Sequence, residues 1–484
     1  MESRSCGESP STSVRVRAAV GAATWAGVAI ALSLPHVWAT EDPFGSALRG
    51  AVALGMFAPW YWWLLRLPPA PRPAGLGIAF GGGFFIGAAR AWIVMGWIFR
   101  VAASPWLALV LGCFWSGIVL AVVSVAAWGL LRLRRWDQGF SAALAVLLLD
   151  KATGGLPGLP VPYLTSVFAV VAALPTRVIS CLGWEGIAGS VGLIGLGLAR
   201  CARGEWRGPT LASGIASIVL AGLLLRSAPA GGPPAMREWR IMAFRSGTAF
   251  LAWSHGGVTR PPEIVVLPEE AVVTSEDTSA EGQAADSISL AQLEETLKEV
   301  RCRVVVAGLW TDLGEENKAY RNSVIVIDRE RRKTVRDKTV AAPGGESVPF
   351  ANLPWLGRLF RDATDVEEEL RSRASDHCPV LVGDVRLATS ICYEHLMLNP
   401  SVAWGVRGRG QADLLVAIGD LERLGPAGKT DLVRSRPARR LHAAVLGAPL
   451  VYVTERGMEW TRPDGESHFQ PYAADGTATI SLLF

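Results

Sequence analysis

The chain has 484 residues, of which 50% are hydrophobic and 19% charged, and its mean hydropathy is +0.30. Residues 1–226 hold 17 Lys or Arg against 8 Asp or Glu, a net +9, whereas residues 227–484 hold 30 against 35, a net −5. This pattern excludes a disordered chain, a disulfide-stabilised miniprotein and a single soluble domain. The polar half is acidic and has no basic stripe, so we expect no nucleic-acid partner. The composition predicts an integral membrane protein with a large aqueous domain.

Seven stretches in the first half reach the roughly 20 mainly apolar residues that a spanning helix needs. They cover residues 18–39, 46–65, 74–99, 105–131, 141–175, 184–202 and 208–225. The fifth is interrupted by Asp150, Lys151 and a Gly/Pro-rich run at 155–160, and such backbone is tolerated at membrane depth only where protein or water surrounds it. We therefore predict a transmembrane bundle of about seven spans over residues 1–226.

The positions of arginine predict the orientation of the bundle, because short cytoplasmic loops are enriched in basic residues. Alternate connections contain Arg15 and Arg17, then Arg66 and Arg72, then Arg132, Arg134 and Arg135, then Arg200, Arg203 and Arg207. The N-terminus is thus expected in the cytoplasm and the second half of the chain in the periplasm of a bacterial inner membrane. Arg90 interrupts an apolar helix, which predicts either a functional residue or a pairing within the bundle.

A Pro/Gly-rich linker at 227–237 separates the bundle from a domain at 238–484 in which short β-rich runs alternate with helical ones. The predicted strands are Trp239–Phe244, Glu263–Leu267, Val304–Leu309, Ser323–Ile327, Arg386–Ile391, Leu414–Ile418, Leu450–Val453 and Thr477–Leu483. Residues 289–300 have the apolar spacing of an amphipathic helix, and Ser289 and Gln292 fit a capping box at its start. Strands alternating with helices predict a layered α/β domain.

The seven cysteines and six histidines show no spacing typical of a zinc site, so no metal is expected. The run Gly425–Thr430 resembles a phosphate-binding loop, but Arg423 stands where that motif needs its first glycine. No cofactor is therefore expected. In a periplasmic domain Cys302 and Cys378 could be oxidised together, and their spacing alone leaves the redox state open.

Three residues of the second half combine into a plausible catalytic set. Cys392 ends an apolar strand in Ile391-Cys-Tyr-Glu394, and Glu269 follows another strand in Leu267-Pro-Glu. Lys338 lies in Asp337-Lys-Thr, and the chain has only six lysines against 41 arginines. A nucleophile, a general base and a cationic donor to an oxyanion suffice for acyl transfer through a thioester.

The order Pro-Glu, Asp-Lys and Ile-Cys-Tyr-Glu resembles the nitrilase, or carbon–nitrogen hydrolase, superfamily. With a membrane bundle before it, the chain resembles the bacterial apolipoprotein N-acyltransferase family. Pro343-Gly-Gly-Glu-Ser-Val-Pro-Phe350 and the Gly/Phe-rich helix Gly83–Trp92 are similar to segments of that family. The resemblance implies an αββα sandwich after a multi-span helical bundle.

The resemblance also implies a reaction and its partners. Cys392 takes an acyl chain from a membrane phospholipid as a thioester, and the chain is then transferred to the α-amine of a diacylglyceryl-cysteine at a lipoprotein N-terminus. Glu269 acts as base, and Lys338 with the Tyr393 N–H holds the oxyanion. Glu346 is expected to orient Lys338 or a lid, and Glu394 to support the pocket behind Cys392.

Some segments depart from the family pattern. Residues 419–425 replace its Asn-Asp-Ala-Trp-Phe-Gly, a helical Glu is replaced near Val445, and the last membrane helix is missing after Phe484. These departures indicate a divergent paralogue and leave two alternatives open: a membrane-anchored amidase with the same trio, and a catalytically weak relative with a binding role. Acyl-chain preference, natural acceptor and oligomeric state are not indicated by the sequence.

Overall fold

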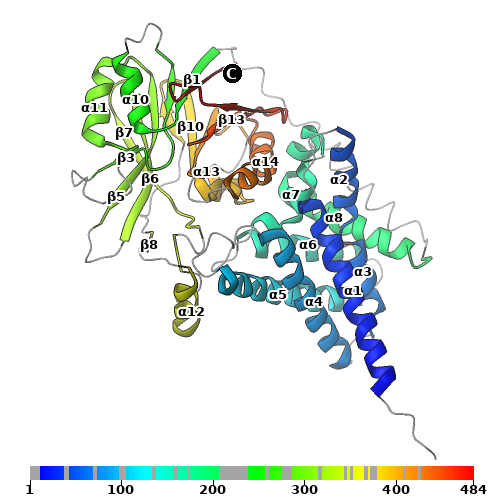
Figure 1. Ribbon diagram of the computed structural model, residues 1–484. Helices are drawn as coiled ribbons and strands as arrows, with labels where there is room; N and C mark the ends of the chain where they lie inside the picture. The colour runs from blue at the N-terminus through cyan, green and yellow to red at the C-terminus, as the bar shows by residue number, and fades with distance from the viewer. Residues whose placement is uncertain are drawn as a thin grey trace, which may run out of the picture.

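A helical bundle and an α/β domain lie side by side in the computed structural model of the chain (Figure 1). It describes residues 11–37, 43–68, 73–96, 105–132, 138–155, 162–172, 174–205, 238–256, 261–274, 286–313, 319–342, 346–348, 351, 353–364, 369–370, 379–406, 409–421 and 427–483. The predicted linker at 227–237 and the seventh predicted stretch, 208–225, lie outside these residues.

The described part of the bundle lies within residues 11–205 and is built from helices that follow one another along the chain. They are α1 (Ser11–Val37), α2 (Pro43–Gly55), α3 (Ala58–Arg66), α4 (Pro73–Met95), α5 (Pro105–Leu130), α6 (Gln138–Gly155), the short 3-10 helix η3 (Pro162–Leu164), α7 (Ser166–Val171) and α8 (Thr176–Cys201). Among the described residues, four segments are long and apolar enough to cross a membrane: Val20–Val37, Pro73–Met95, Gly112–Leu130 and Thr176–Cys201. The second predicted stretch is divided between α2 and α3, and the count of seven crossings remains a prediction.

Two buried charged residues stabilise the bundle around its broken fifth stretch. The Asp150 carboxylate, at the end of α6, accepts hydrogen bonds from the Ser166 N–H at 2.8 Å and the Ser166 hydroxyl at 2.5 Å, and so caps α7. Arg90, in α4, donates to Nε2 of His36 at 2.9 Å and to the Leu164 carbonyl. Arg90 therefore joins α1, α4 and η3, which favours its pairing role.

The α/β domain contains two sheets. The first comprises β1 (Glu238–Phe244), β2 (Ile264–Val266), β3 (Val272–Val273), β4 (Ile288–Ser289), β5 (Val304–Asp312), β6 (Ala319–Asp328), β7 (Lys333–Asp337), β8 (Glu369–Leu370) and β15 (Thr477–Leu483), in the order β15-β1-β2-β5-β3-β4 with β6 also pairing β5, β7 and β8. The second comprises β9 (Val380–Val382), β10 (Val385–Ile391), β11 (Leu414–Ile418), β12 (Leu450–Thr454), β13 (Gly457–Thr461) and β14 (Ser467–Pro471), in the order β14-β13-β12-β11-β10-β9. The central strands β1-β2-β5 and β10-β11-β12 are parallel.

Helices cover the outer faces of both sheets. α10 (Gly247–His255) and α11 (Leu290–Glu299) lie on the first sheet, while α13 (Pro400–Trp404) and α14 (Ala427–Leu446) lie on the second, between it and the bundle (Figure 1). One apolar core fills the space between the sheets and includes Val266, Val306 and Val416, and another lies under α10 and α11. This is the αββα sandwich that the nitrilase resemblance implies, and the predicted fold class is confirmed.

The predicted strands all form: Leu414–Ile418 and Thr477–Leu483 have the predicted bounds, and the ends of the others differ by at most four residues. The predicted capping box is present too: Ser289 Oγ accepts from the Gln292 N–H, and the Gln292 side chain accepts from the Ser289 N–H. The prediction lacks the short or edge strands, which are β3, β4, β7, β8, β9, β13 and β14. They contain too few residues, or too many polar ones, to produce a clear period-2 pattern.

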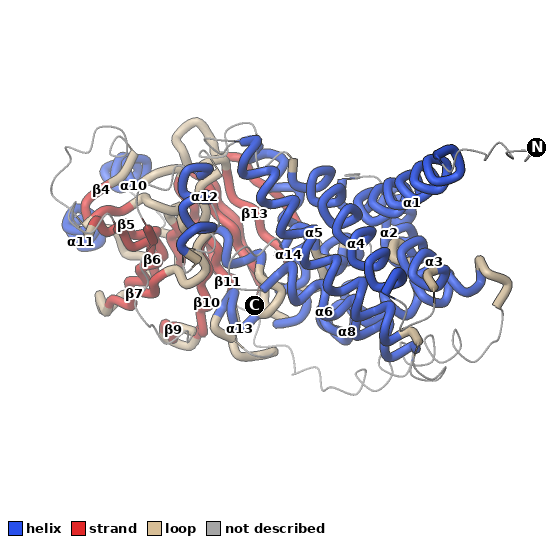
Figure 2. Tube along the Cα trace, turned by 90° about the horizontal axis from the view of Figure 1, so that it is seen from below, coloured by secondary structure: helices blue, strands red, loops and turns tan. Residues whose placement is uncertain are grey.

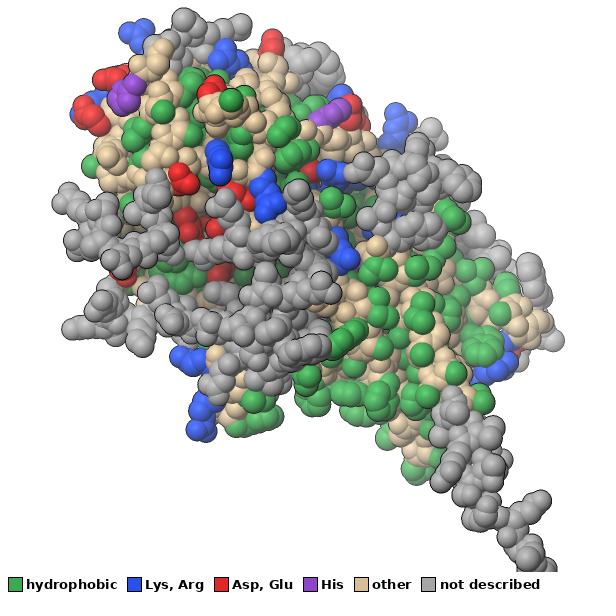
Figure 3. All heavy atoms as spheres, viewed as in Figure 1, with side chains coloured by type: hydrophobic (Ala, Val, Ile, Leu, Met, Phe, Trp, Pro, Cys, Tyr) green, Lys and Arg blue, Asp and Glu red, His purple; other side chains and the backbone are tan. Residues whose placement is uncertain are grey.

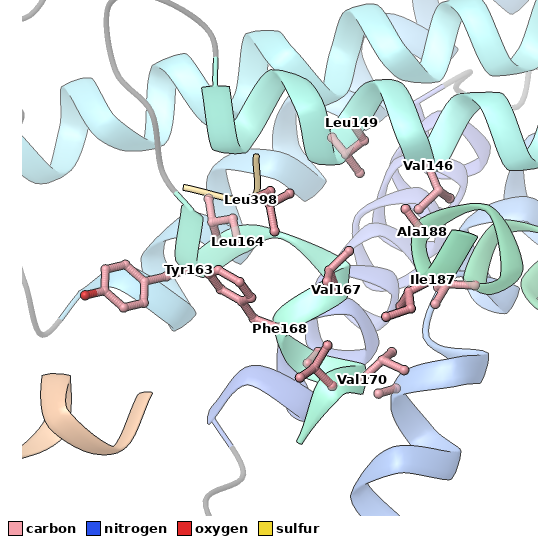
Figure 4. Packing of buried hydrophobic residues seen from close by; sticks show 14 of the residues in the cluster. Val146, Leu149, Tyr163, Leu164, Val167, Phe168, Val170, Ile187, Ala188 and Leu398 are labelled. Carbon is pink, nitrogen blue, oxygen red and sulfur yellow. The ribbon is translucent and has the colours of Figure 1, made fainter. Parts of the chain in front are cut away.

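The α/β domain packs against the bundle through a shared hydrophobic core. Leu396, Met397, Leu398 and Trp404 belong to the same buried cluster as residues of α6, α7 and α8, and Figure 4 shows Leu398 beside Leu164. Seen from below, α14 lies along the bundle helices (Figure 2). Figure 3 shows hydrophobic side chains over the bundle and most charged ones on the α/β domain.

Candidate active site

The site lies where parallel strands of the two sheets end. Glu269 follows β2, Cys392 follows β10 and Asp420 follows β11. Ligands of α/β sheets bind outside the carboxyl ends of the strands, because loops from several strands meet there. Lys338 directly follows β7, and its backbone N–H donates to the Asn322 carbonyl at 2.8 Å. The fold thus brings together residues that are separated by up to 151 positions in the sequence.

Glu269, Lys338 and Glu346 form a buried ionic cluster. The Lys338 ammonium is completely buried and lies 3.3 Å from Oε1 of Glu269 and 2.5 Å from Oε1 of Glu346. The Asn322 amide donates to Oε1 of Glu269 at 2.5 Å, and the Asp420 N–H donates to Oε2 of Glu269 at 2.9 Å. These donors fix the orientation of the Glu269 carboxylate.

Electrostatics keep Lys338 protonated. Burial alone lowers the pKa of the ammonium, but the negative charges of Glu269, Glu346 and the Cys392 thiolate outweigh it and raise that pKa well above its usual value of 10.5. Thr339, the residue after Lys338, and Ile391, the residue before Cys392, both donate their N–H groups to the Glu394 carboxylate, so Lys338 lies beside the Cys392 turn. The cluster therefore supplies a cation beside the Cys392 turn at physiological pH.

Cys392 lies at a sharp turn between strand β10 and the 3-10 helix η5 (Cys392–Leu396). Its φ is +47°, a conformation that non-glycine residues rarely adopt. The Cys392 carbonyl accepts a hydrogen bond from Nδ1 of His395, one helical turn further on. Strained backbone of this kind persists only where surrounding contacts enforce it, and it is concentrated at functional sites. Tyr393, the next residue, is partly buried against the shared core.

Glu394 is fully buried directly behind Cys392. Its Oε1 accepts from the Thr339 N–H at 2.6 Å and from the Thr339 hydroxyl at 2.9 Å, and its Oε2 accepts from the Ile391 N–H at 3.0 Å. Arg336 pairs with the same carboxylate at 3.0 Å. Glu394 thus ties the segment that contains Lys338 to the turn that contains Cys392.

Sequence reasoning missed two polar residues of the site. Asn322 is buried in β6 and reaches both Glu269 and Glu346, at 2.5 and 3.4 Å. Arg336, in β7, binds Glu394 and the Thr389 carbonyl. An amide inside an otherwise apolar strand was the available signal for Asn322, whereas Arg336 has no distinctive context among so many arginines. Residues 422–426, which include most of the loop that differs from the family pattern, lie outside the described residues.

Among the described residues, no group of three His, Cys, Asp or Glu side chains is arranged to hold a metal ion. Cys378 lies outside the described residues, so its relation to Cys302 remains untested. Cys302 is buried, and burial raises the pKa of its thiol to about 12.

Solved structures similar to this chain include amidases and a synthetase. An amidase from Nesterenkonia sp. is 12% identical over 53% of this chain and 94% of its own, with a TM-score of 0.30. The glutamine-dependent NAD+ synthetase from Acinetobacter baumannii is 12% identical over 51% of this chain and 45% of its own, with a TM-score of 0.33. No protein-family model and no curated protein matches the chain. Identities this low describe a likeness of fold alone.

We expect Gly308→Ala to displace Glu269. A Cβ on Gly308, in β5, would lie 2.5 Å from the Pro268 carbonyl oxygen and 2.6 Å from Cα of Glu269, so the backbone that carries Glu269 must move. Overpacking of this kind costs about 1–3 kcal/mol of stability. Thermal unfolding and the rate of Cys392 acylation measure the two effects.

The matched control is Gly256→Ala, whose Cβ would meet nothing nearer than the Trp253 carbonyl at 3.3 Å. It should retain the acylation rate. Normal acylation in Gly308→Ala would show that the close approach of β5 does not position Glu269.

Proposed function

We propose that the chain is an N-acyltransferase that moves an acyl chain from a membrane phospholipid, through a thioester on Cys392, to the α-amine of a diacylglyceryl-cysteine lipoprotein. The observation that carries this proposal is the buried Glu269–Lys338–Glu346 cluster beside the strained Cys392 turn, in a domain that shares its core with apolar helices. The combination offers covalent acyl chemistry next to a lipid phase.

In the first half-reaction Glu269 takes the thiol proton of Cys392, and the sulfur attacks the carbonyl carbon of a phospholipid ester. Lys338 and the Tyr393 N–H stabilise the oxyanion of the tetrahedral intermediate. The ester C–O bond then breaks, Glu269 returns the proton to the leaving alkoxide, and a lysophospholipid departs. The acyl chain remains on sulfur as a thioester.

In the second half-reaction the neutral α-amine of the lipoprotein attacks the thioester carbonyl. Glu269 takes the amine proton, the C–S bond breaks and an amide forms. Glu269 then returns the proton to the Cys392 sulfur. Both substrates carry acyl chains whose removal from the bilayer costs about 0.8 kcal/mol per CH₂, which explains why a membrane bundle would accompany this chemistry.

The position of α12 (Pro354–Thr364) supports access from a membrane. This helix begins eight residues after Glu346 and packs beside α5 of the bundle. Within the helix Trp355 is 66% exposed and Leu359 38%, and Arg358 and Arg361 are also exposed. Exposed aromatic and apolar side chains mixed with arginines are typical of helices in the headgroup layer.

Vesicles of phosphatidylethanolamine and phosphatidylglycerol, mixed with the purified chain, test the proposal. We expect lysophospholipid in an amount equal to the protein and an acyl adduct on Cys392, both detected by mass spectrometry. A membrane-anchored amidase, the alternative with the same trio, would release no lysophospholipid from lipid alone and would instead cleave small amides. Absence of both activities would favour the binding relative that the altered loop at 419–425 suggests.

We further propose a bacterial inner-membrane location with the α/β domain in the periplasm, because of the alternating arginines described above. A reporter enzyme that works only in the periplasm, fused after Phe484, should be active. The same reporter inserted between Arg66 and Arg72, in a predicted cytoplasmic connection, should be inactive. The reverse pattern would contradict the proposed sidedness.

A further inference from the structure

A buried aromatic side chain outside the catalytic trio contacts both halves of the candidate site. Tyr452, in β12, is 1% exposed, and its ring centroid lies 4.8 Å from that of His395. His395 donates through Nδ1 to the Cys392 carbonyl and so supports the strained turn of the nucleophile. Burial, aided by the charge of Arg439, lowers the pKa of His395 well below 6.5, so the imidazole stays neutral at neutral pH.

The other end of Tyr452 meets the loop that holds the base. A Cβ on Gly419 would lie 2.6 Å from the Tyr452 hydroxyl oxygen and 3.2 Å from two ring carbons. The Gly419 backbone therefore packs directly on the phenol. The N–H of the next residue, Asp420, donates to Oε2 of Glu269 at 2.9 Å.

Tyr452 is itself held by a buried arginine. The Arg439 guanidinium lies 4.6 Å from the ring centroid, in cation–π range. Arg439 is fully buried and donates to the Glu459 carboxylate at 2.9 Å, to the Ser435 hydroxyl at 2.8 Å and to the Leu432 carbonyl at 2.7 Å. Each of these partners fixes the plane of the guanidinium.

Arg439 belongs to α14, the helix that also docks the domain on the bundle. From this helix, Arg434 donates to the Val94 carbonyl at 2.7 Å, and Arg440 donates to the carbonyls of Val171, Ala172 and Leu174 at 2.8–3.0 Å. The helix whose Arg439 contacts Tyr452 is thus also hydrogen-bonded to the membrane bundle.

We infer that Tyr452, clamped by Arg439, is a positioning residue that sets Cys392 and Glu269 relative to each other. The expected effect on acylation rests on the proposed acyl-transfer function, whereas the geometric argument concerns only Cys392 and Glu269. A side chain that backs both the nucleophile turn and the base loop fixes their separation. A misplacement of about 1 Å at a reacting centre can cost about 100-fold in rate.

The test uses the full chain in detergent and three variants: Gly419→Ala, Tyr452→Leu and the double variant Gly419→Ala with Tyr452→Phe. One readout is the acyl adduct on Cys392 from phosphatidylethanolamine vesicles. The second is the rate of alkylation of the Cys392 peptide by iodoacetamide between about pH 6 and pH 10, which reports thiolate formation without any lipid.

We expect Gly419→Ala and Tyr452→Leu each to slow acylation about 100-fold. Each should also move the pH profile of alkylation toward that of an isolated thiol, with a midpoint near about 8.5. The double variant should regain most of the lost acylation rate, because removing the Tyr452 hydroxyl oxygen makes room for the methyl group added at position 419.

The matched control is Tyr472→Leu. Tyr472 lies in the same domain and donates to the carbonyls of Phe244 and Thr454 at 2.9 and 2.7 Å. Its replacement should lower the unfolding temperature without moving the pH profile.

An unchanged pH profile in Gly419→Ala, or no recovery in the double variant, would overturn the inference. A wild-type chain that forms no acyl adduct would contradict the proposed function instead. The alkylation profiles would still decide the role of Tyr452.

Discussion

Acyl transfer is expected to fall to background in Cys392→Ala. The thioester needs a nucleophilic sulfur, and removal of a covalent nucleophile costs about 10⁶-fold in related acyl-transfer chemistry. Cys392 lies at a strained strand end that Glu394 ties to the segment of Lys338, a position in which no other described cysteine is found. Acyl-enzyme formation, followed by mass spectrometry with phospholipid vesicles, measures the loss.

Cys302→Ala is the matched control for this variant. Burial raises the pKa of the Cys302 thiol to about 12, so that thiol stays protonated and unreactive. The substitution should cost about 1 kcal/mol of stability and leave acylation intact. The corresponding prediction for Cys378→Ala is the same. Retained turnover in Cys392→Ala would end the thioester mechanism.

Lys338→Met and Glu269→Gln should both block acylation at neutral pH, but only the second should recover in alkali. Loss of one oxyanion donor costs about 100- to 1,000-fold in rate, and no change of pH replaces the missing cation. Glu269→Gln instead leaves the thiol protonated, with a pKa near its usual value of about 8.5. Raising the pH to about 9 supplies thiolate without a base, and acylation should return in part.

Because Lys338 is buried with two carboxylates, Lys338→Met needs a further control. In the wild-type chain the Lys338 ammonium lies 3.3 Å from Oε1 of Glu269 and 2.5 Å from Oε1 of Glu346, and the substitution leaves both carboxylates without this cation. Breaking a buried pair in this way costs about 3–5 kcal/mol of stability. Adding Glu346→Gln removes one uncompensated charge, so the double variant should recover stability but not acylation.

Labelled acyl-enzyme is quantified for these variants at neutral and alkaline pH, with thermal unfolding measured alongside. An identical response of Lys338→Met and Glu269→Gln to pH would show that base and oxyanion donor are wrongly assigned. Recovery of acylation in Lys338→Met with Glu346→Gln would show that Lys338 serves only to neutralise the carboxylates.

The sequence alone determined the two-part organisation and the fold class. Long apolar stretches and strand-sized β-rich runs are local properties, so α4, β10 and β11 are found close to where their patterns predict them. The Glu269, Lys338 and Cys392 trio was also indicated by sequence, because short motifs surround each residue. The alternation of arginine-containing connections predicted the orientation of the bundle in the membrane, and no contact within the chain tests that prediction.

Only the tertiary structure decided what holds these residues in place. The contact of Asn322 with Glu269 joins positions 53 residues apart, and that of Gly419 with Tyr452 joins the residue after β11 to the middle of β12. The burial of α14 between the second sheet and the bundle was likewise not predictable from its sequence. The segment contains many polar residues, and Pro437 lies inside the helix, where proline is normally disruptive. Local patterns record which face of an element is buried, whereas the partner that buries it depends on how distant segments of the chain pack together.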